Sequence, residues 1–326
     1  MPTTRRTVLG GLGLLAAPGL MRNAWASSHR LTVASLLGPD KPETRIWQHI
    51  RDLVEQERPG AFQFNIVPNA ALGGERQVLE GMRLGSIQAG LATAASLATW
   101  VPACEVLDLP YAFRDGAHLG RVLAGEMGRE IAALLSESGF EAPAFIDYGP
   151  RNLLAQEALT RPEAMKGRRI RVIDSALHRR LWQAFGAVPA AIPIPETYNA
   201  LSNGVVDTMD LTLPASVGFK LYEVVPVTTE TRHIRAAGAV LFSTSFWVRL
   251  DEAEKALLTR AASEGAVRFG TLLAEEEAAG RAQVLSAGGR FIAAEAPERW
   301  QEIARTIWPA TADALGGMAR LESLLR

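Results

Sequence analysis

The chain has 326 residues, 48% of them hydrophobic, which is enough for two domains of ordinary size with sizeable cores. Its 34 basic and 35 acidic residues nearly balance, so no basic excess indicates binding to nucleic acid or to an anionic membrane. The single cysteine, Cys104, excludes an internal disulfide, and packing alone must stabilise the fold.

The first 26 residues predict an export signal that is separate from the fold. Residues 4–9 (TRRTVL) have a twin-arginine pattern, residues 8–20 are apolar, and residues 24–26 (Ala-Trp-Ala) resemble a cleavage site. We expect export through the twin-arginine pathway to a bacterial periplasm, with an uncleaved anchor as the alternative. Cleavage after residue 26 leaves 31 basic and 35 acidic residues, a net charge of −4.

The mature chain opens with alternating strand and helix patterns. Residues 31–35 predict an apolar strand, and the helix that follows has apolar residues at helical spacing, such as Ile46, Trp47 and Ile50. Residues 62–67 alternate as a second strand, and residues 87–92 predict a third, followed by a turn of small residues. This order favours a parallel sheet with covering helices.

Two residues of this first set are candidates for ligand contact. Glu75 begins a predicted helix after a glycine pair at which the backbone can turn close to a ligand, although an acid in a first turn is also favoured by the helix dipole. Ser96 follows the third strand, and ligands of open parallel sheets lie at such carboxyl ends.

The central part of the chain repeats the alternation. Residues 115–139 predict two helices divided near Gly125, and residues 145–148 predict a strand that ends at Tyr148. A second strand–helix–strand set then covers residues 169–210. Two such sets predict two α/β lobes.

Two arginines flank the start of this second set. In residues 169–172, alternation places Ile170 and Val172 on one face of a strand and Arg171 on the other, away from the core. A guanidinium is planar, charged and forked, which suits a carboxylate held by two hydrogen bonds. We therefore interpret Arg171 and Arg151 as candidate carboxylate ligands, with ordinary surface ion pairs as the alternative.

The remaining chain is mostly helical. Residues 239–242 predict an apolar strand, and a helical pattern then persists over residues 251–287, longer than is usual in a globular protein. Trp300, Ile303 and Ile307 predict a further amphipathic helix, with one more at the C-terminus.

No catalytic, cofactor or metal constellation stands out. The sequence has no Gly-x-Ser-x-Gly elbow and no Gly-x-x-x-x-Gly-Lys phosphate loop. The histidines show no metal-ligand spacing, and alternation places Asp207 and Asp210 on opposite strand faces. We expect His233 to be structural, and we expect neither cofactor nor metal.

Several motifs, in their order, resemble the solute-receptor subunits of tripartite ATP-independent periplasmic (TRAP) transporters. These motifs are LGGER at 72–76, LDLPYAF at 107–113, GPR at 149–151, KGRRIRV at 166–172, ETYNAL at 196–201 and GVVD at 204–207. The resemblance covers nearly the whole mature chain. It implies an α/β, two-lobed, periplasmic-binding-protein-like fold of class II type, with the ligand cleft between the lobes and a long helix spanning both.

The resemblance also implies domains, site residues and partners. Lobe I would comprise residues 27–149 plus about 237–274, and lobe II residues 150–236 plus about 275–326. Arg171 matches the arginine that makes a two-pronged contact with a substrate carboxylate, Arg151 matches an assisting arginine, and residues after Asp207 line the pocket. The site expected from residues and resemblance together is Arg171, Arg151, Asp210, Leu211, Glu75, Ser96 and Tyr148. The expected partners are a small organic acid and membrane permease subunits, for a receptor that is a monomer by default.

At one point the chain departs from the family pattern. Thr208 replaces a usual glycine, and Leu211 replaces a usual polar or aromatic pocket residue. This favours a less hydroxylated organic acid over a sugar acid. Two alternatives are an enzyme acting on a carboxylate through Asp207, Asp210 or Glu75, and a receptor that presents its ligand to a sensor kinase.

Overall fold

The computed structural model describes residues 28–313 and 316–326, so the expected export signal at residues 1–26 lies outside the described residues. In this part of the chain, no helix combines the length and the hydropathy that crossing a membrane requires.

The strands form one mixed sheet with parallel ends and an antiparallel centre. Their order is β2-β1-β3-β8-β4-β7-β5-β6, and β9 pairs with β8. The strands β1, β2 and β3 are mutually parallel, as are β5, β6 and β7, whereas β4 and β8 pair antiparallel between them. The strands are β1 (His29–Ala34), β2 (Phe62–Val67), β3 (Ala89–Thr93), β4 (Phe140–Ala155), β5 (Arg169–Val172), β6 (Val188–Ala191), β7 (Thr208–Thr212), β8 (Val227–Ser243) and β9 (Arg290–Ala293).

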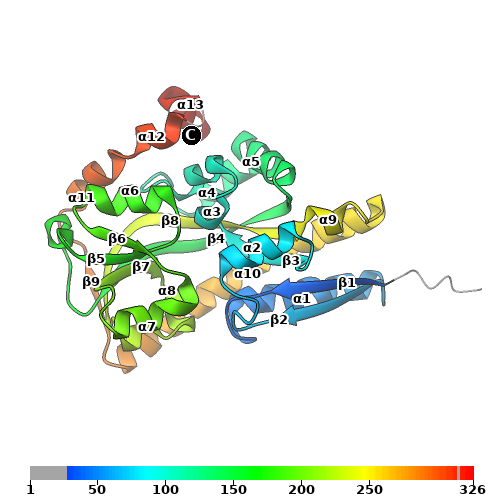
Figure 1. Cartoon of the computed structure of the whole chain (residues 1–326), viewed down its shortest axis with the longest axis horizontal. Coiled ribbons are helices and arrows are strands. Elements are labelled where there is room, and N and C mark those ends of the chain that lie inside the picture. The colour runs from blue at the N-terminus through cyan, green and yellow to red at the C-terminus, as the bar shows by residue number, and fades with distance from the viewer. Residues whose placement is uncertain (1–27, 314–315) are drawn as a thin grey trace, which may run out of the picture.

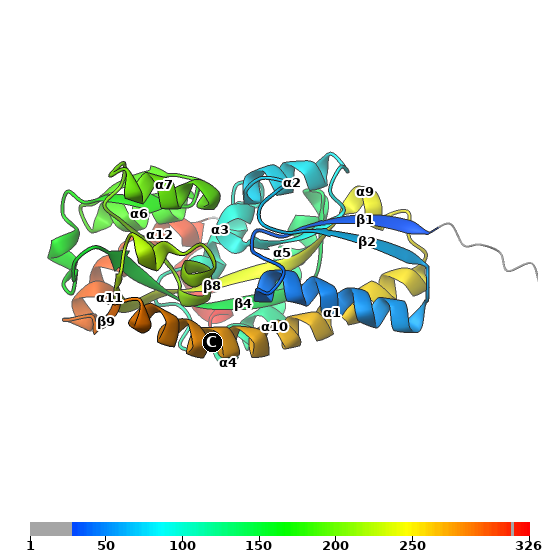
Figure 2. The ribbon, with the colours of Figure 1, turned by 90° about the horizontal axis from the view of Figure 1, so that it is seen from below.

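Helices cover both faces of this sheet. In Figure 2, α2 and α1 lie on opposite sides of β1 and β2, and in Figure 1, α6 and α7 flank β5, β6 and β7. We call the part built on β1–β3 the first lobe and the part built on β5–β7 the second lobe. The α-helices are α1 (Pro42–Glu57), α2 (Glu75–Arg83), α3 (Ala94–Leu97), α4 (Gly116–Ala124), α5 (Glu126–Glu137), α6 (Ala176–Ala184), α7 (Thr197–Ser202), α8 (Leu213–Gly218), α9 (Thr244–Trp247), α10 (Glu252–Ser286), α11 (Pro297–Arg305), α12 (Trp308–Ala312) and α13 (Met318–Leu324).

Two long strands join the lobes. The downstream part of β8 lies between β3 and the upstream part of β4, whereas Arg151–Ala155 of β4 pairs with β7. The register between β4 and β8 shifts between Asp147 and Gly149 and again between Arg151 and Leu153. Such irregularities bend a strand, and these occur where the chain passes from one lobe to the other.

The helix α10 spans both lobes, as the resemblance implies. It has 35 residues, about 50 Å at the usual rise per residue, and begins with a capping box of Asp251 and Glu254. Figure 2 shows it running beneath the whole molecule. It contacts α1 in the first lobe and α8 in the second. The two-lobed α/β fold with a spanning helix is therefore confirmed.

The structure differs from the sequence-based expectations in local detail. The small-residue turn expected at residues 94–96 is the short helix α3, and β4 and β8 are much longer than the expected segments 145–148 and 239–242. The strand β9 was not expected at all. The bulged register of β4 and β8 explains their underestimated lengths, because a bulge interrupts the two-residue alternation by which a strand is recognised.

Close packing of α1 on α10 depends on Gly265, and this predicts opposite effects for two glycine substitutions. A Cβ at Gly265 would lie 2.8 Å from Cγ1 of the fully buried Ile50. Gly265→Ala should therefore lower the free energy of unfolding by about 1–3 kcal/mol through overpacking. Gly270 of the same helix has open space at its Cβ position, so Gly270→Ala should raise this free energy by about 0.5–1 kcal/mol. Denaturant unfolding of both variants checks this, and equal effects would contradict the packing described.

Candidate functional site

Two adjoining cavities lie between the lobes, at the carboxyl ends of β1, β3, β5 and β7. Ligands of open α/β sheets bind at such ends. The outer cavity has a volume of about 260 Å³ and the inner cavity about 50 Å³. The inner cavity is lined by Leu36, Glu43, Glu75, Thr93, Tyr148, Arg151, Arg171, Ile173, Ile194, Leu211, Thr212, Ala215, Phe219 and Ala236.

Arg171 is a buried cation whose hydrogen bonds are incomplete. It lies on β5, is 3% exposed and lines both cavities. Its Nε donates a hydrogen bond to the carbonyl oxygen of Ile192 at 2.8 Å, but its Nη1 has no hydrogen-bond partner among the described residues. A buried guanidinium nitrogen without an acceptor is unfavourable. The side chain is therefore arranged to receive an acceptor from the cavity.

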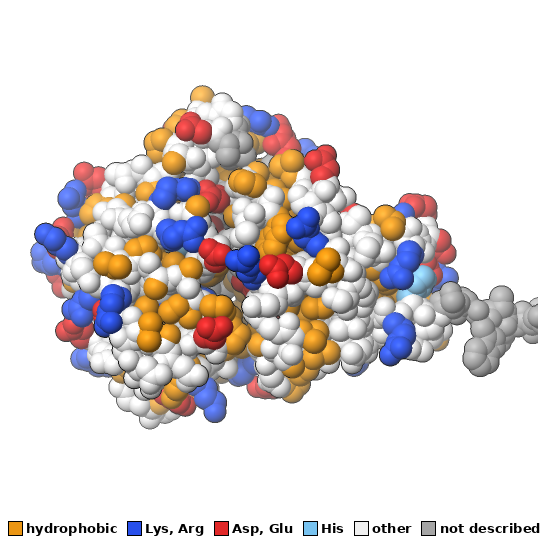
Figure 3. Space-filling model, viewed as in Figure 1, with side chains coloured by type: hydrophobic (Ala, Val, Ile, Leu, Met, Phe, Trp, Pro, Cys, Tyr) orange, Lys and Arg blue, Asp and Glu red, His pale blue; other side chains and the backbone are white. Residues whose placement is uncertain are grey.

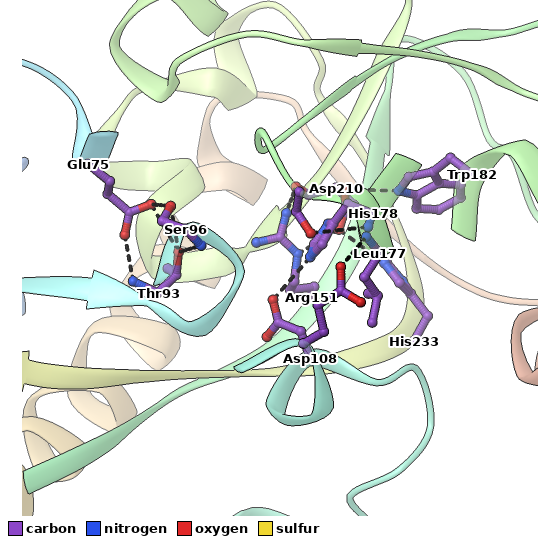
Figure 4. A network of polar contacts seen from close by, with 12 residues as sticks. Glu75, Thr93, Ser96, Asp108, Arg151, Leu177, His178, Trp182, Asp210 and His233 are labelled. Carbon is purple, nitrogen blue, oxygen red and sulfur yellow. Dashed lines mark hydrogen bonds and ion pairs between the residues drawn. The ribbon is translucent and has the colours of Figure 1, made fainter. Parts of the chain in front are cut away.

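Arg151, by contrast, is paired with Asp210. Its Nε donates to Oδ2 of Asp210 at 2.6 Å, and its Nη2 donates to the backbone carbonyl of Asp210 at 2.6 Å. The same carboxylate contacts Nε2 of His233 at 3.1 Å and accepts from Nε1 of Trp182 at 3.3 Å. Figure 4 shows these groups gathered at the centre and right of the view, apart from the cluster of Glu75, Thr93 and Ser96 at the left.

The pKa shifts follow from this arrangement. Burial, reinforced by repulsion from Arg151, lowers the pKa of Arg171 to about 10, so that it remains charged at neutral pH. Burial opposes ionisation of Asp210, but the attraction of Arg151 and the hydrogen bond with His233 together outweigh it and hold the pKa of Asp210 well below its usual range. Burial also lowers the pKa of His233 and favours its neutral form. Arg171 is thus a buried cation of the site whose hydrogen bonds within the described residues are incomplete.

The opposite wall of the site is acidic and belongs to the first lobe. Glu75 accepts hydrogen bonds from the backbone N–H and the hydroxyl of Thr93, at 2.7 and 3.0 Å, and from the hydroxyl of Ser96. Beside it lies Glu43, in the first turn of α1. Burial, with repulsion from Glu75, raises the pKa of Glu43 to about 8.

The remaining lining is largely apolar. Leu211, Ile173, Ile194 and Phe219 line the inner cavity. The ring of Tyr148 packs edge-on against Phe269 of α10, with 5.3 Å between the ring centroids. Burial raises the pKa of Tyr148 well above its usual value, so its hydroxyl keeps its proton.

The structure brings most of the expected site residues together. The inner cavity is lined by five of them, Arg171, Arg151, Leu211, Glu75 and Tyr148. The outer cavity is lined by Ser96, and also by Arg171 and Glu75. Asp210 lies one layer deeper, lines neither cavity and holds Arg151.

Other residues considered from the sequence lie outside the cavities. Asp207 pairs with the half-exposed Arg169, and His233 is fully buried between Thr231 and Asp210, as expected of a structural histidine. No group of acidic, histidine or cysteine side chains within residues 28–313 and 316–326 could hold a metal ion.

Sequence reasoning missed Glu43. Its only signal is its position, an acid in the first turn of a helix directly after Pro42, and this pattern is common because acids there interact favourably with the helix dipole. Its place in the cleft depends on tertiary packing. The same holds for Thr93, which orients Glu75.

Basic and acidic side chains are interspersed on the face shown in Figure 3. No broad field of one sign occurs on this face, unlike the basic surface that a nucleic-acid partner needs.

Comparison with known proteins gives one consistent result. The model of the family described as "bacterial extracellular solute-binding protein, family 7" matches residues 33–314. A solute-binding protein of Roseobacter denitrificans is 31% identical over 72% of each chain. The C4-dicarboxylate-binding periplasmic protein of Rhodobacter capsulatus is 28% identical over 95% of each. The crystal structure of a TRAP periplasmic solute-binding protein of Roseobacter denitrificans with bound L-galactonate has a TM-score of 0.86 and 26% identity, covering 92% of this chain and 100% of that one.

The buried pair of Arg151 and Asp210 predicts a large loss of stability when one partner is removed. Asp210→Ala leaves Arg151 charged and uncompensated, so the free energy of unfolding should fall by about 3–5 kcal/mol. Asp207→Ala removes an ion pair near the surface on the same segment and should cost no more than about 1 kcal/mol. Chemical denaturation of both variants measures the difference, and a similar cost at the two positions would contradict this account.

The raised pKa of Glu43 predicts how the stability of the fold changes with pH. A carboxyl whose pKa rises from 4.5 to about 8 on folding stabilises the fold fully below pH 4.5, and this stability is lost as the pH rises through about 8. Glu43→Gln, which is neutral at every pH, should therefore be more stable than the wild type at pH 8, by at least the ~1.4 kcal/mol of one pKa unit, and similar to it at pH 4.5. Melting temperatures of both proteins across this range test it. Glu55→Gln, in an exposed position of α1, is the control and should show no such pH-dependent difference.

Proposed function

The chain belongs to family 7 of the bacterial extracellular solute-binding proteins, the receptors of TRAP transporters, and we propose that it captures a small organic acid between its lobes and delivers it to a membrane permease. One observation carries the choice of ligand. Arg171 presents a buried guanidinium nitrogen without an acceptor to a cavity lined by both lobes. A carboxylate supplies the missing acceptor and the missing charge.

Arg171 and Arg151 have different roles in this proposal. Arg171 binds the carboxylate directly, because its forked donors are not all used by the protein. Arg151 positions the site, because Asp210 holds two of its nitrogens. The positive charge of Arg151 still faces the inner cavity and adds to the attraction for an anion.

Closure of the lobes would strengthen this binding. Exclusion of water lowers the effective dielectric around the pair of Arg171 and the carboxylate, so the charges attract more strongly. We place the lobe boundaries near residues 149 and 236, with residues 27–149 plus about 237–274 in the first lobe and 150–236 plus about 275–326 in the second. The register shifts of β4 around Gly149 and Arg151 support hinges there.

The proposal includes the absence of an enzymatic reaction. Of the acids that an enzyme could use, Asp207 is paired with Arg169 and Asp210 with Arg151, and Glu75 accepts three hydrogen bonds. Recovery of the bound acid chemically unchanged after long incubation tests this, and a modified product would contradict it.

We further propose export to the periplasm by the twin-arginine pathway, on the paired arginines at residues 5 and 6, and a monomeric receptor. The ligand would be less hydroxylated than a sugar acid. The apolar side chain of Leu211 in the inner cavity supports this, because it cannot satisfy a ligand hydroxyl.

The role of Arg171 predicts a specific loss of affinity. Arg171→Ala should weaken binding of the physiological acid by about 2–5 kcal/mol, and Arg171→Lys should also weaken it, because an ammonium group cannot form the planar fork. Arg169→Ala, on the same strand but half-exposed and paired with Asp207, is the control and should bind like the wild type.

Thermal-shift screening of residues 27–326 against carboxylates, followed by calorimetry, measures these changes. Saturation at ~100 times the dissociation constant adds about 2.7 kcal/mol to stability, which is readily visible. A loss of less than about threefold in Arg171→Ala, well below the range typical of buried charge pairs, would contradict the assignment.

A further inference from the structure

The inner cavity is lined by charges of opposite sign that come from the two lobes. The second lobe contributes Arg171, and the first lobe contributes Glu43 from α1 and Glu75 from α2. The two carboxylates are close enough for repulsion between them to affect ionisation. A ligand that fills this cavity therefore contacts a cation with one end and an acidic pair with the other.

Of the charged groups around this acidic pair, Arg151 and Arg171 attract Glu75, but no cation favours the ionisation of Glu43. On β4, Arg151 is held by Asp210 of β7, and Tyr148 keeps its proton. On α2, Glu75 is anchored by donors from Thr93 and Ser96. Burial and repulsion from Glu75 raise the pKa of Glu43, and a hydrogen bond from the backbone N–H of Leu36 lowers it. No cation contributes to this shift.

The walls between these ends restrict the ligand further. The cavity is also lined by the apolar side chains of Leu36, Ile173, Ile194, Leu211 and Phe219. A ligand hydroxyl that meets one of these apolar side chains would lose its hydration without gaining a partner. A second carboxylate at the far end would lie near Glu75, whose charge already disfavours ionisation of Glu43 and would repel the carboxylate as well.

We propose that the ligand is a short aliphatic zwitterion, whose carboxylate is bound by Arg171 and whose ammonium group is bound by Glu43 and Glu75. This inference rests on the proposed function, since it names the class of organic acid for the same site. It makes Glu43 a specificity-determining residue that selects the group at the far end of the ligand.

The proposal has a consequence for proton exchange. In the empty site Glu43 holds a proton near neutral pH, because repulsion from Glu75 and burial favour its neutral form. A ligand ammonium favours the ionised form, so the carboxyl proton of Glu43 leaves for the solvent as the ammonium binds. A hydroxyl in this place causes no net proton exchange, whereas a second carboxylate requires proton uptake.

A matched ligand series separates these cases. The probes are 4-aminobutanoate, 4-hydroxybutanoate and glutarate, which differ in the group at one end, together with their homologues one carbon shorter and longer, and galacturonate. Calorimetry near neutral pH, in buffers of different ionisation enthalpy, gives both the affinity and the number of protons exchanged. We expect an amino acid of the series to bind at least about tenfold more tightly than its hydroxy and dicarboxylate analogues, a difference readily resolved in the dissociation constant, with release of protons.

Two variants locate the effect. Glu43→Gln should reduce the affinity for the amino acid at least about tenfold, abolish proton release and leave the affinity for the hydroxy analogue within about twofold. Glu55→Gln, on the exposed side of the same helix, should behave like the wild type.

Failure of this inference can be distinguished from failure of the proposed function. Tighter binding of glutarate or galacturonate than of every amino acid, or proton uptake instead of release, would overturn the zwitterion while leaving an organic-acid receptor in place. No binding of any probe by folded protein stripped of ligand would overturn both.

Discussion

The charge of Arg171, buried without a full set of acceptors, is the constraint around which the cleft is built. Burying a cation is costly unless an anion or several acceptors compensate it. The protein supplies one carbonyl acceptor, from Ile192, and leaves Nη1 without one. A neighbouring cation, Arg151, adds repulsion, which Asp210 reduces by holding Arg151 in a pair of its own. Asp210 thus pairs with one arginine, and the other is the one that we propose to bind the ligand.

The basic and the acidic side chains of the site belong to different lobes. Arg171 stands on the short strand β5 of the second lobe, and Glu43 and Glu75 begin helices of the first lobe. The walls are joined by β4 and β8, which belong to both lobes and change register close to Arg151, and by α10, which packs along both. A movement at these joints changes the distance between Arg171 and the two acids. A ligand that contacts both ends stabilises one such distance, which couples occupancy of the site to the shape that a permease would recognise.

Much of this arrangement could be predicted from the sequence, and the exceptions have physical causes. Alternation in residues 169–172 predicted a strand with Arg171 on the face opposite to Ile170 and Val172. This could be predicted because a two-residue period fixes the side-chain direction locally. The role of Asp210 could not be predicted in this way. The strand β7 extends to Thr212, beyond the expected end of the second set at residue 210. Asp210 holds Arg151, whereas Leu211 lines the cavity. Glu43 could not be predicted because its neighbours Glu75 and Tyr148 come from elements distant in the sequence, and only the packed fold places them together.

The family of the chain and the chemistry of its ligand are separate questions, and they depend on different residues. The related protein of Rhodobacter capsulatus is described as binding C4-dicarboxylates, and the structurally similar one of Roseobacter denitrificans contains L-galactonate. A shared fold therefore accommodates ligands with different groups beyond the first carboxylate. In this chain the groups that would meet that second part are Glu43, Glu75 and Leu211. In the binding mode that we propose, the acids of the first lobe would disfavour another carboxylate, and Leu211 of the second lobe would disfavour a row of hydroxyls. Since such discrimination results as much from unfavourable contacts with the wrong ligand as from favourable contacts with the right one, the acidic wall opposite Arg171 is as important for specificity as the arginine is for affinity.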